Sequence, residues 1–272
     1  MPIARINDVN IHYESHGSGF PLVFVYGLGG NTGMWAGQID AFAPHYRFIT
    51  WDPRGHGKSD SPPHWKQYGL KIAAQDLNGL LDHLGIEQAF VGGLSMGGGI
   101  AATYAVAHPE RVRALLIMDS NSASGLGQKP AMRAMREKSI ELAETLGMQA
   151  VADYVIEANP NLKIQAAASP EARRDMCQMY LDLNPVGYAN TIRTMLEEIF
   201  PTEKLATLKM PTLVLAGETD PSLDAARLTH SMIPGAEFVM LPDAGHTSNL
   251  DNPQAFNASV LAFLRQHEVP AA

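Results

Sequence analysis

The stretch Gly93-Leu94-Ser95-Met96-Gly97 places one serine between two glycines. It follows the apolar run 88–92, which has the composition of a buried strand, and it leads into residues 97–107, where apolar residues recur at helical spacing. The glycines let the backbone close a tight turn that holds the Ser95 hydroxyl away from the sheet. The free N–H groups that begin the following helix would favour a developing negative charge. This pattern makes Ser95 a candidate nucleophile.

Strand and helix patterns alternate on both sides of this turn. Short apolar runs predict eight strands, at residues 3–6, 9–14, 22–26, 46–51, 88–92, 114–118, 211–216 and 237–241. Apolar residues at helical spacing predict helices between them, at residues 35–42, 71–84, 97–107, 222–232 and 253–265. Such alternation implies a parallel sheet with helices on both faces, because parallel strands need crossover connections.

The alternation stops in the middle of the chain. Residues 127–207 contain no convincing strand pattern but predict four helices, at residues 129–146, 148–158, 170–182 and 185–198. Ser169-Pro170 and Asn184-Pro185 are typical helix starts, because proline fits the first turn. We therefore predict an α/β core formed by residues 1–126 and 208–272, with a helical insertion at residues 127–207.

The composition is that of a globular protein. The chain has 272 residues, of which 46% are hydrophobic and 18% are charged, with a net charge of −8. This acidity gives no electrostatic reason to bind nucleic acid or an acidic membrane surface. Its N-terminal residues lack the apolar region of a signal peptide, and no apolar run approaches the roughly 20 residues of a membrane span. Cys177 is the single cysteine, which fits a reducing compartment. We expect a cytoplasmic monomer or homodimer.

A serine hydroxyl needs a base to take its proton, and the base needs a carboxylate to orient it. His246 lies in the loop that follows the predicted strand 237–241, and Asp220 follows the strand 211–216. The carboxyl ends of parallel strands meet at one edge of the sheet, so both side chains are expected near Ser95. The order Ser95, Asp220, His246 is the order expected for a serine on a strand-to-helix turn of this kind.

Other residues compete for both roles. Among the ten histidines, His56 is the best rival base, because it also lies in a loop after a strand. Asp119, at the end of the strand 114–118, is the rival acid. Asp220 precedes Pro221 and could instead be a turn residue that caps the next helix.

A negatively charged intermediate on the attacked carbonyl also needs two N–H donors. Met96, the residue after the candidate nucleophile, is expected to supply one of them. The other is expected from Leu28, because Gly27-Leu28-Gly29-Gly30 follows the strand 22–26 and allows close backbone approach. These glycines could also serve only to make a turn. We expect neither a metal nor an organic cofactor.

These residues together resemble the α/β-hydrolase superfamily over essentially the whole chain. Beyond the Ser95 turn, the resemblance rests on three segments, Asp52-Pro53-Arg54-Gly55-His56-Gly57-Lys58-Ser59, His108-Pro109-Glu110-Arg111-Val112 and Asp243-Ala244-Gly245-His246. It implies an α/β-hydrolase fold: a mostly parallel eight-stranded sheet with helices on both faces and an inserted helical cap over the pocket. It also implies that the loop around His56 shapes the core beneath the site, which disfavours His56 as the base.

Within the superfamily, Gly93-Leu94-Ser95-Met96-Gly97-Gly98 and the four-helix cap are most similar to small carboxylesterases and 3-oxoadipate enol-lactonase-like hydrolases. Many members have His-Gly at the turn that binds the oxyanion, whereas this chain has Tyr26-Gly27. The Tyr26 hydroxyl is expected to reach either the pocket or a partner in the core.

The resemblance implies a carboxylic ester hydrolase that cleaves a small ester or lactone through an acyl-enzyme on Ser95. The serine excludes relatives that use an aspartate at this turn, such as haloalkane dehalogenases and epoxide hydrolases. Two alternatives share the same three residues, a carbon–carbon bond hydrolase of the meta-cleavage type and a perhydrolase-like enzyme. A more remote alternative is a non-catalytic ligand receptor on the same fold. The expected partner is a small-molecule substrate.

Overall fold

The computed structural model describes residues 2–120, 130–167, 169–198, 200 and 202–268. Its strands form one sheet in the order β1-β2-β4-β3-β5-β6-β7-β8. β1 and β2 pair antiparallel with their neighbours, and the other pairs are parallel, so the predicted mostly parallel eight-stranded sheet is confirmed. The strands are β1 (Ile3–Ile6), β2 (Val9–His16), β3 (Pro21–Val25), β4 (Arg47–Trp51), β5 (Ala89–Leu94), β6 (Val112–Met118), β7 (Thr212–Gly217) and β8 (Glu237–Leu241).

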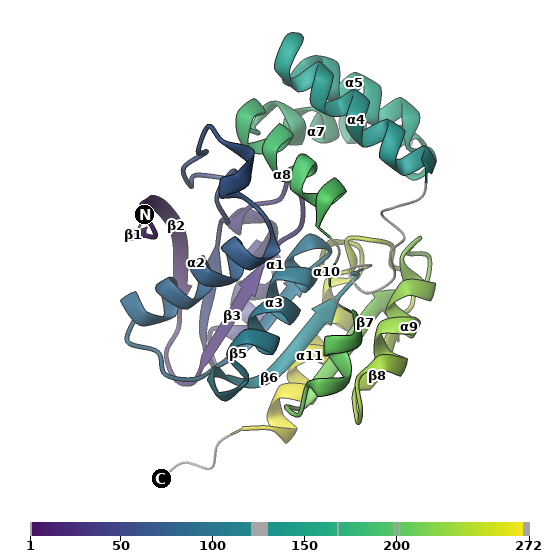
Figure 1. The fold of residues 1–272 in the computed structure, drawn as a ribbon. Coiled ribbons are helices and arrows are strands. Elements are labelled where there is room, and N and C mark those ends of the chain that lie inside the picture. The colour runs from purple at the N-terminus through teal and green to yellow at the C-terminus, as the bar shows by residue number, and fades with distance from the viewer. Residues whose placement is uncertain (1, 121–129, 168, 199, 201, 269–272) are drawn as a thin grey trace.

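Helices cover both faces of this sheet (Figure 1). The helices of the core are α1 (Ala36–Phe42), α2 (Leu70–His83), α3 (Met96–Ala107), α9 (Leu223–Met232), α10 (Ser248–Asp251) and α11 (Pro253–Gln266). Short 3-10 helices join them, at η1 (Thr32–Trp35), η2 (Trp65–Gln67), η3 (Pro109–Arg111) and η5 (Thr202–Thr207).

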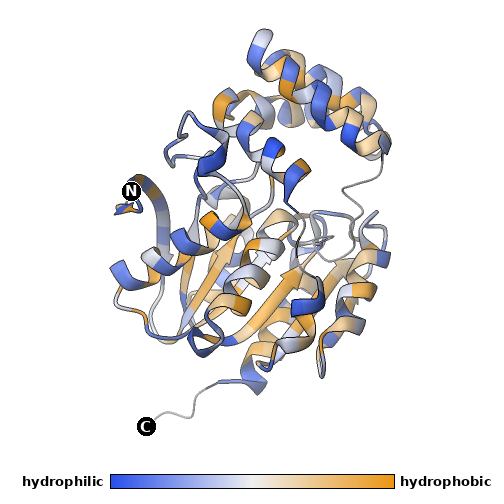
Figure 2. Cartoon of the chain, viewed as in Figure 1, coloured by the Kyte–Doolittle hydropathy of each residue, from blue (hydrophilic) through white to orange (hydrophobic). Residues whose placement is uncertain are grey.

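Successive residues of each central strand point to opposite faces and enter two separate cores. In β3, Val23 and Val25 pack in the cluster that includes residues of α2, α3 and α9. Leu22 and Phe24 pack on the other face, against residues of α1 and α11. Figure 2 shows the central strands as hydrophobic along their length, as expected for a sheet that is covered on both sides.

Five helices lie between β6 and β7 in the described part of the chain and form the cap. They are α4 (Pro130–Thr145), α5 (Met148–Ala158), α6 (Pro160–Ala167), α7 (Pro170–Leu181) and α8 (Pro185–Glu197). The four-helix expectation for the cap was wrong because it missed α6, whose eight residues carry no continuous apolar stripe. The predicted start of the insertion, residue 127, lies outside the described residues.

One cap helix, α8, is held tightly to the core. Gly187 packs against the backbone of Gly55, and a β carbon on Gly187 would collide with the Gly55 carbonyl oxygen, 2.5 Å away. The Asn190 amide donates to the carbonyl oxygens of Pro62 and Pro63 at 3.4 Å and 3.2 Å. Just beyond the helix, the Glu198 carboxylate accepts from the N–H that begins α2, 2.7 Å away.

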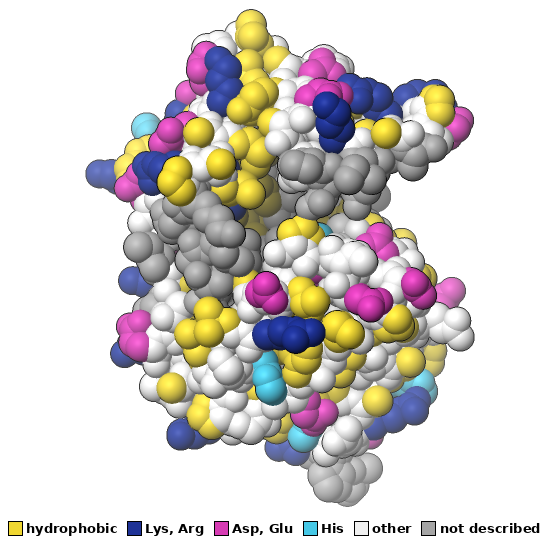
Figure 3. Space-filling view, turned by 90° about the vertical axis from the view of Figure 1, so that its right-hand side faces the viewer, with side chains coloured by type: hydrophobic (Ala, Val, Ile, Leu, Met, Phe, Trp, Pro, Cys, Tyr) yellow, Lys and Arg dark blue, Asp and Glu magenta, His cyan; other side chains and the backbone are white. Residues whose placement is uncertain are grey.

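The helices α4 and α5 of the cap pack together with α8. Ile140, Val151 and Ile192 belong to one apolar cluster that joins α4, α5 and α8. Arg193 of α8 also pairs with Glu144 of α4 at 2.6 Å. Figure 1 shows these helices together above the sheet, and Figure 3 shows a hollow between them and the sheet domain on one side of the molecule.

Among the described residues, no helix combines the length and the apolar character needed to cross a membrane.

Candidate active site

Ser95 occupies the turn between β5 and α3, as the sequence predicts. Its φ of 57° lies in the left-handed region, which is rare for a residue with a side chain, and the surrounding contacts hold it there. Its N–H donates to the carbonyl of Met118 at 2.8 Å. A β carbon on Gly97 would collide with the carbonyl oxygens of Val25 and Tyr26. Glycine is therefore required at this position, because α3 begins against the ends of the strands.

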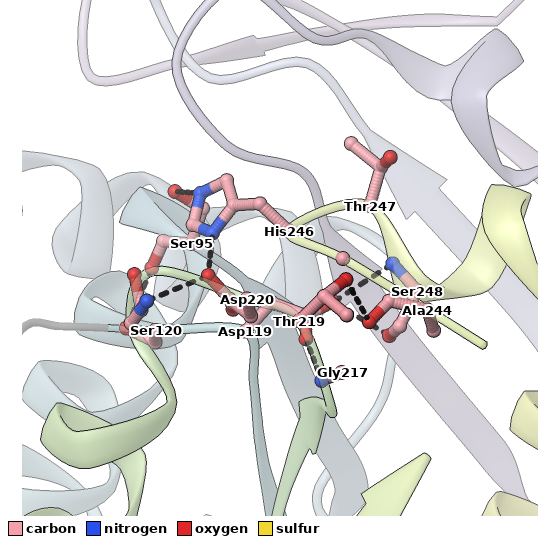
Figure 4. Close-up of polar contacts among 12 residues, drawn as sticks. Ser95, Asp119, Ser120, Gly217, Thr219, Asp220, Ala244, His246, Thr247 and Ser248 are labelled. Atoms are coloured by element: carbon pink, nitrogen blue, oxygen red, sulfur yellow. Dashed lines mark hydrogen bonds and ion pairs between the residues drawn. The ribbon is translucent and has the colours of Figure 1, made fainter. Parts of the chain in front are cut away.

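The structure brings Ser95, His246 and Asp220 into one hydrogen-bond chain (Figure 4). His246 Nε2 lies 2.9 Å from Ser95 Oγ, and His246 Nδ1 lies 3.0 Å from Asp220 Oδ1. The arrangement fits a neutral ring whose Nδ1–H donates to Asp220 while Nε2 accepts the serine proton. The Asp220 side chain is fully buried, and it also accepts from the N–H of Ser222 at 2.7 Å. This second bond fixes the carboxylate toward His246.

The carboxylates around His246 favour its protonated form. Partial burial of the ring lowers its pKa, but the hydrogen bond and charge of Asp220, with the charges of Asp119 and Asp251, outweigh this effect. The pKa of His246 is therefore raised above its ordinary value of 6.5. An imidazolium formed beside Ser95 would be stabilised in the same way.

The rival residues occupy other positions. His56 is buried at 3% exposure, with its Nδ1 3.3 Å from the carbonyl oxygen of Arg54. Burial lowers the pKa of His56, so its ring favours the neutral form. The Asp119 carboxylate accepts from the N–H of Gly217 and from both the N–H and the hydroxyl of Ser248. The carboxylate that contacts His246 is that of Asp220.

The loop after β3 passes beside Ser95. A β carbon on Gly27 would lie 2.7 Å from the Ser95 β carbon, so the backbone of residue 27 is packed against the serine. Leu28 follows, and its half-buried side chain packs against both the core and the cap clusters. Met96, at 9% exposure, is the first residue of α3. The two predicted N–H donors, Leu28 and Met96, thus belong to the two backbone segments that border Ser95.

Tyr26 points into the core, which answers the question that the sequence left open. Its hydroxyl donates to Asn249 Oδ1 at 3.3 Å, and its ring packs against Gly30, where a β carbon would collide with it. Burial raises the pKa of Tyr26 far above its usual value, so the hydroxyl stays neutral. Asn249 also contacts Gln38 at 3.2 Å. Tyr26 therefore ties the loop beside Ser95 to α10, the short helix that follows His246.

Sequence reasoning missed the residues that hold the His246 loop. Asp251 accepts from the N–H of Gly245 at 2.8 Å and from the hydroxyl of Thr247 at 3.1 Å. Nothing in the sequence separates Asp251 or Asn249 from ordinary surface polar residues, because their partners come together only in the folded loop. In the described part of the chain, no group of three or more His, Cys, Asp or Glu side chains is placed to hold a metal ion.

Comparison with known proteins agrees with this fold. Residues 21–149 match the family model described as the alpha/beta hydrolase fold, and residues 174–272 match one described as TAP-like protein. The chain belongs to the alpha/beta hydrolase family. Its relatives support a hydrolytic enzyme.

Three relatives illustrate the range of the family. The chain is 31% identical to 3-oxoadipate enol-lactonase 2 of Acinetobacter baylyi, over 95% of this chain and 94% of the relative. It is 30% identical to the 2-hydroxy-6-oxononadienedioate/2-hydroxy-6-oxononatrienedioate hydrolase of Paraburkholderia phymatum, over 95% and 92%. A solved thermophilic esterase from Thermogutta terrifontis superposes with a TM-score of 0.83 at 29% identity, over 96% of this chain and 95% of that one.

Proposed function

We propose that this protein is a serine hydrolase that cleaves a small carboxylic ester or lactone through an acyl-enzyme on Ser95. The observation that carries the proposal is the continuous hydrogen-bond chain from Ser95 Oγ through His246 to the buried Asp220. These three hydrogen-bonded residues supply a nucleophile, a base with a raised pKa and a carboxylate that orients the base.

The geometry supports a two-stage reaction. Ser95 Oγ attacks the carbonyl carbon while its proton passes to His246 Nε2, and Asp220 stabilises the imidazolium. The oxyanion accepts from the N–H groups of Leu28 and Met96. When the intermediate collapses, the bond to the leaving oxygen breaks and His246 returns the proton to the alkoxide. Water then attacks the acyl-enzyme, again with His246 as the base, and releases the acid and free Ser95.

A small ester or lactone is favoured over the alternatives by the border of the site and by the names of the relatives. The two residues expected to donate N–H groups beside Ser95, Leu28 and Met96, are both apolar, which suits an uncharged acyl group. Two of the three relatives described above are named as a lactonase and an esterase. A carbon–carbon bond hydrolase would use the same three residues, and one relative is named for such a substrate class.

A substrate panel separates these reactions. We expect short-chain esters and enol-lactones to be hydrolysed with a higher kcat/KM than a vinylogous 1,5-diketone. If only the diketone is cleaved, the carbon–carbon bond hydrolase is correct. If no substrate is cleaved and a fluorophosphonate forms no covalent adduct, the protein is a non-catalytic receptor and not an enzyme.

A fluorophosphonate tests the nucleophile directly. The reagent should form one covalent adduct on Ser95, because His246 activates that hydroxyl alone, and mass spectrometry of the digested protein locates the adduct. Ser95→Ala should abolish labelling. Ser120→Ala is a matched control: the Ser120 hydroxyl donates to the Ser95 carbonyl at 2.7 Å, so removing it leaves the Ser95 hydroxyl in place and this variant should keep the label. An adduct on any residue other than Ser95 would falsify the assignment.

The pH dependence follows from the raised pKa of His246. His246 must be neutral to accept the serine proton, so activity is present above its pKa and is lost as the pH falls through it. The acid limb of kcat/KM for an uncharged ester should therefore have its midpoint above 6.5. Initial rates across the pH range measure this limb. A midpoint below the ordinary histidine value would mean that the carboxylates do not act on His246 as described.

A further inference from the structure

Asp119 is a buried carboxylate to which the proposed mechanism gives no role. It lies at the end of β6 with 0% exposure, and its φ of 45° is in the left-handed region. Its Oδ1 accepts from the N–H of Gly217 at 3.0 Å. Its Oδ2 accepts from the N–H of Ser248 at 3.0 Å and from the Ser248 hydroxyl at 2.6 Å. A buried carboxylate is costly unless its oxygens are hydrogen-bonded, and strained backbone conformations cluster at functional sites. Both features of Asp119 therefore indicate a specific role near the site.

These bonds join the two loops that carry the partners of Ser95. Gly217 ends β7 and lies three residues before Asp220, while Ser248 lies two residues after His246. The backbone N–H of Asp119 also donates to the carbonyl of Leu215 within β7, at 2.8 Å. One carboxylate therefore connects the end of β6 to the Asp220 loop on one side and to the His246 loop on the other (Figure 4).

We propose that Asp119 is a positioning residue that fixes the His246 loop against the Asp220 loop, so that Nδ1–H of His246 stays aimed at Asp220. The proposal rests on the proposed function, because it assigns Asp119 a role in the reaction at Ser95. Asp119 acts through its neighbours, and the catalytic carboxylate remains Asp220.

The negative charge of Asp119 also reaches His246. Asp119 is one of the carboxylates that raise the pKa of His246. The pKa of Asp119 itself is raised to about 6, because burial and the charge of Asp220 outweigh the hydrogen bonds from Ser248 and the charge of His246, which lower it. The titratable groups that interact with this carboxylate are Tyr26, Asp220 and His246, and Asp251 in turn acts on Tyr26 and His246.

An amide cannot replace this carboxylate. Asp119 is the acceptor in all three side-chain hydrogen bonds, and both of its carboxylate oxygens take part. In Asp119→Asn, the NH₂ group would face a backbone N–H, either that of Gly217 or that of Ser248, so one of these two backbone bonds would be lost. The substitution also removes the negative charge near His246.

The variant Asp119→Asn should therefore lower kcat for a short-chain ester by about 100-fold, the effect expected when reacting groups are misplaced by about 1 Å. KM should stay close to that of the wild type, because Asp119 does not border the acyl group. The acid limb of kcat/KM should also move to lower pH, because His246 loses a charge that raises its pKa. Steady-state kinetics across the pH range measure all three quantities.

A second buried carboxylate provides the matched control. Asp76 is fully buried and holds Arg54 at 2.6 Å, so Asp76→Asn also removes a buried charge. Its side-chain partners, Arg54 and Asn7, are not partners of the three proposed catalytic residues. We expect Asp76→Asn to lower thermal stability and to leave the acid limb where it is. A purely structural role for Asp119 would give the same unmoved limb in Asp119→Asn and would overturn the proposal.

Ser248→Ala keeps the proposal testable if Asp119→Asn does not fold. It removes one hydroxyl donor to Asp119 and leaves the backbone bond in place, so kcat should fall several-fold with KM unchanged. Wild-type kcat in Ser248→Ala would overturn the proposal. Failure of the proposed function looks different, because the wild-type protein itself would then resist the fluorophosphonate or leave the ester and lactone uncleaved. If the wild type is labelled and the kinetics of both variants are normal, only the role of Asp119 is wrong.

Discussion

Replacing Ser95 with alanine is expected to lower kcat for a short-chain ester by about a million-fold. The alanine has no oxygen to form the acyl-enzyme, so His246 and Asp220 have no nucleophile to activate. The remaining rate would come from substrate binding and from the N–H groups of Leu28 and Met96 acting on direct attack by water. Initial rates at high protein concentration measure this remaining activity. Prior treatment with the fluorophosphonate excludes a contribution from contaminating wild-type protein.

The Ser95→Ala protein should remain folded, because alanine meets the same left-handed backbone strain that serine already bears. Circular dichroism and the thermal midpoint should match those of the wild type closely. Substrate binding should also persist, so the variant should still bind a slowly hydrolysed ester. If Ser95→Ala keeps wild-type turnover, the reaction does not pass through an acyl-enzyme on this residue.

Asp220→Asn is expected to lower kcat by about ten-thousand-fold, with little change in KM. The asparagine NH₂ would face His246 Nδ1 and favour the ring tautomer that carries its proton on Nε2. That tautomer cannot accept the proton of Ser95 Oγ, which lies 2.9 Å from Nε2. Fluorophosphonate labelling should slow in proportion, because it depends on the same proton transfer.

A nearby aspartate gives the control for this variant. Asp224 lies exposed in the first turn of α9, four residues after Asp220, and Asp224→Asn should keep wild-type kcat. The comparison with Asp119→Asn is equally direct. If Asp119→Asn costs more activity than Asp220→Asn, then Asp119, not Asp220, is the catalytic acid.

The sequence was sufficient to predict the sheet, because its central strands are short apolar runs bounded by turns. Each of the eight predicted strands is present, with ends that shift by at most a few residues, as for β2, which continues to His16. The helix α6 escaped prediction because it is short and has no amphipathic stripe. Periodicity reports burial against a neighbour, so a helix without a distinct buried face leaves little trace in it.

Chain order and strand ends were sufficient to bring Ser95, Asp220 and His246 to one edge of the sheet. The same reasoning could not separate Asp119 from Asp220, because both follow neighbouring strands. Only the folded loops show that Asp119 faces donors from Gly217 and Ser248 while Asp220 faces the imidazole. The direction of Tyr26 was open for the same reason, since its partner Asn249 is 223 positions away in the chain.

The attachment of α8 to the core has a consequence for how this protein can be altered. Three contacts attach this helix directly to the core: Gly187 with Gly55, Asn190 with Pro62 and Pro63, and Glu198 with the start of α2. We therefore expect a chimaera that carries a relative's segment in place of residues 130–181 to fold, provided that the apolar packing against Ile192 is kept. Such chimaeras would change the helices above the sheet while Ser95, His246 and Asp220 below keep their alignment, which makes α8 the natural junction for redesigning selectivity.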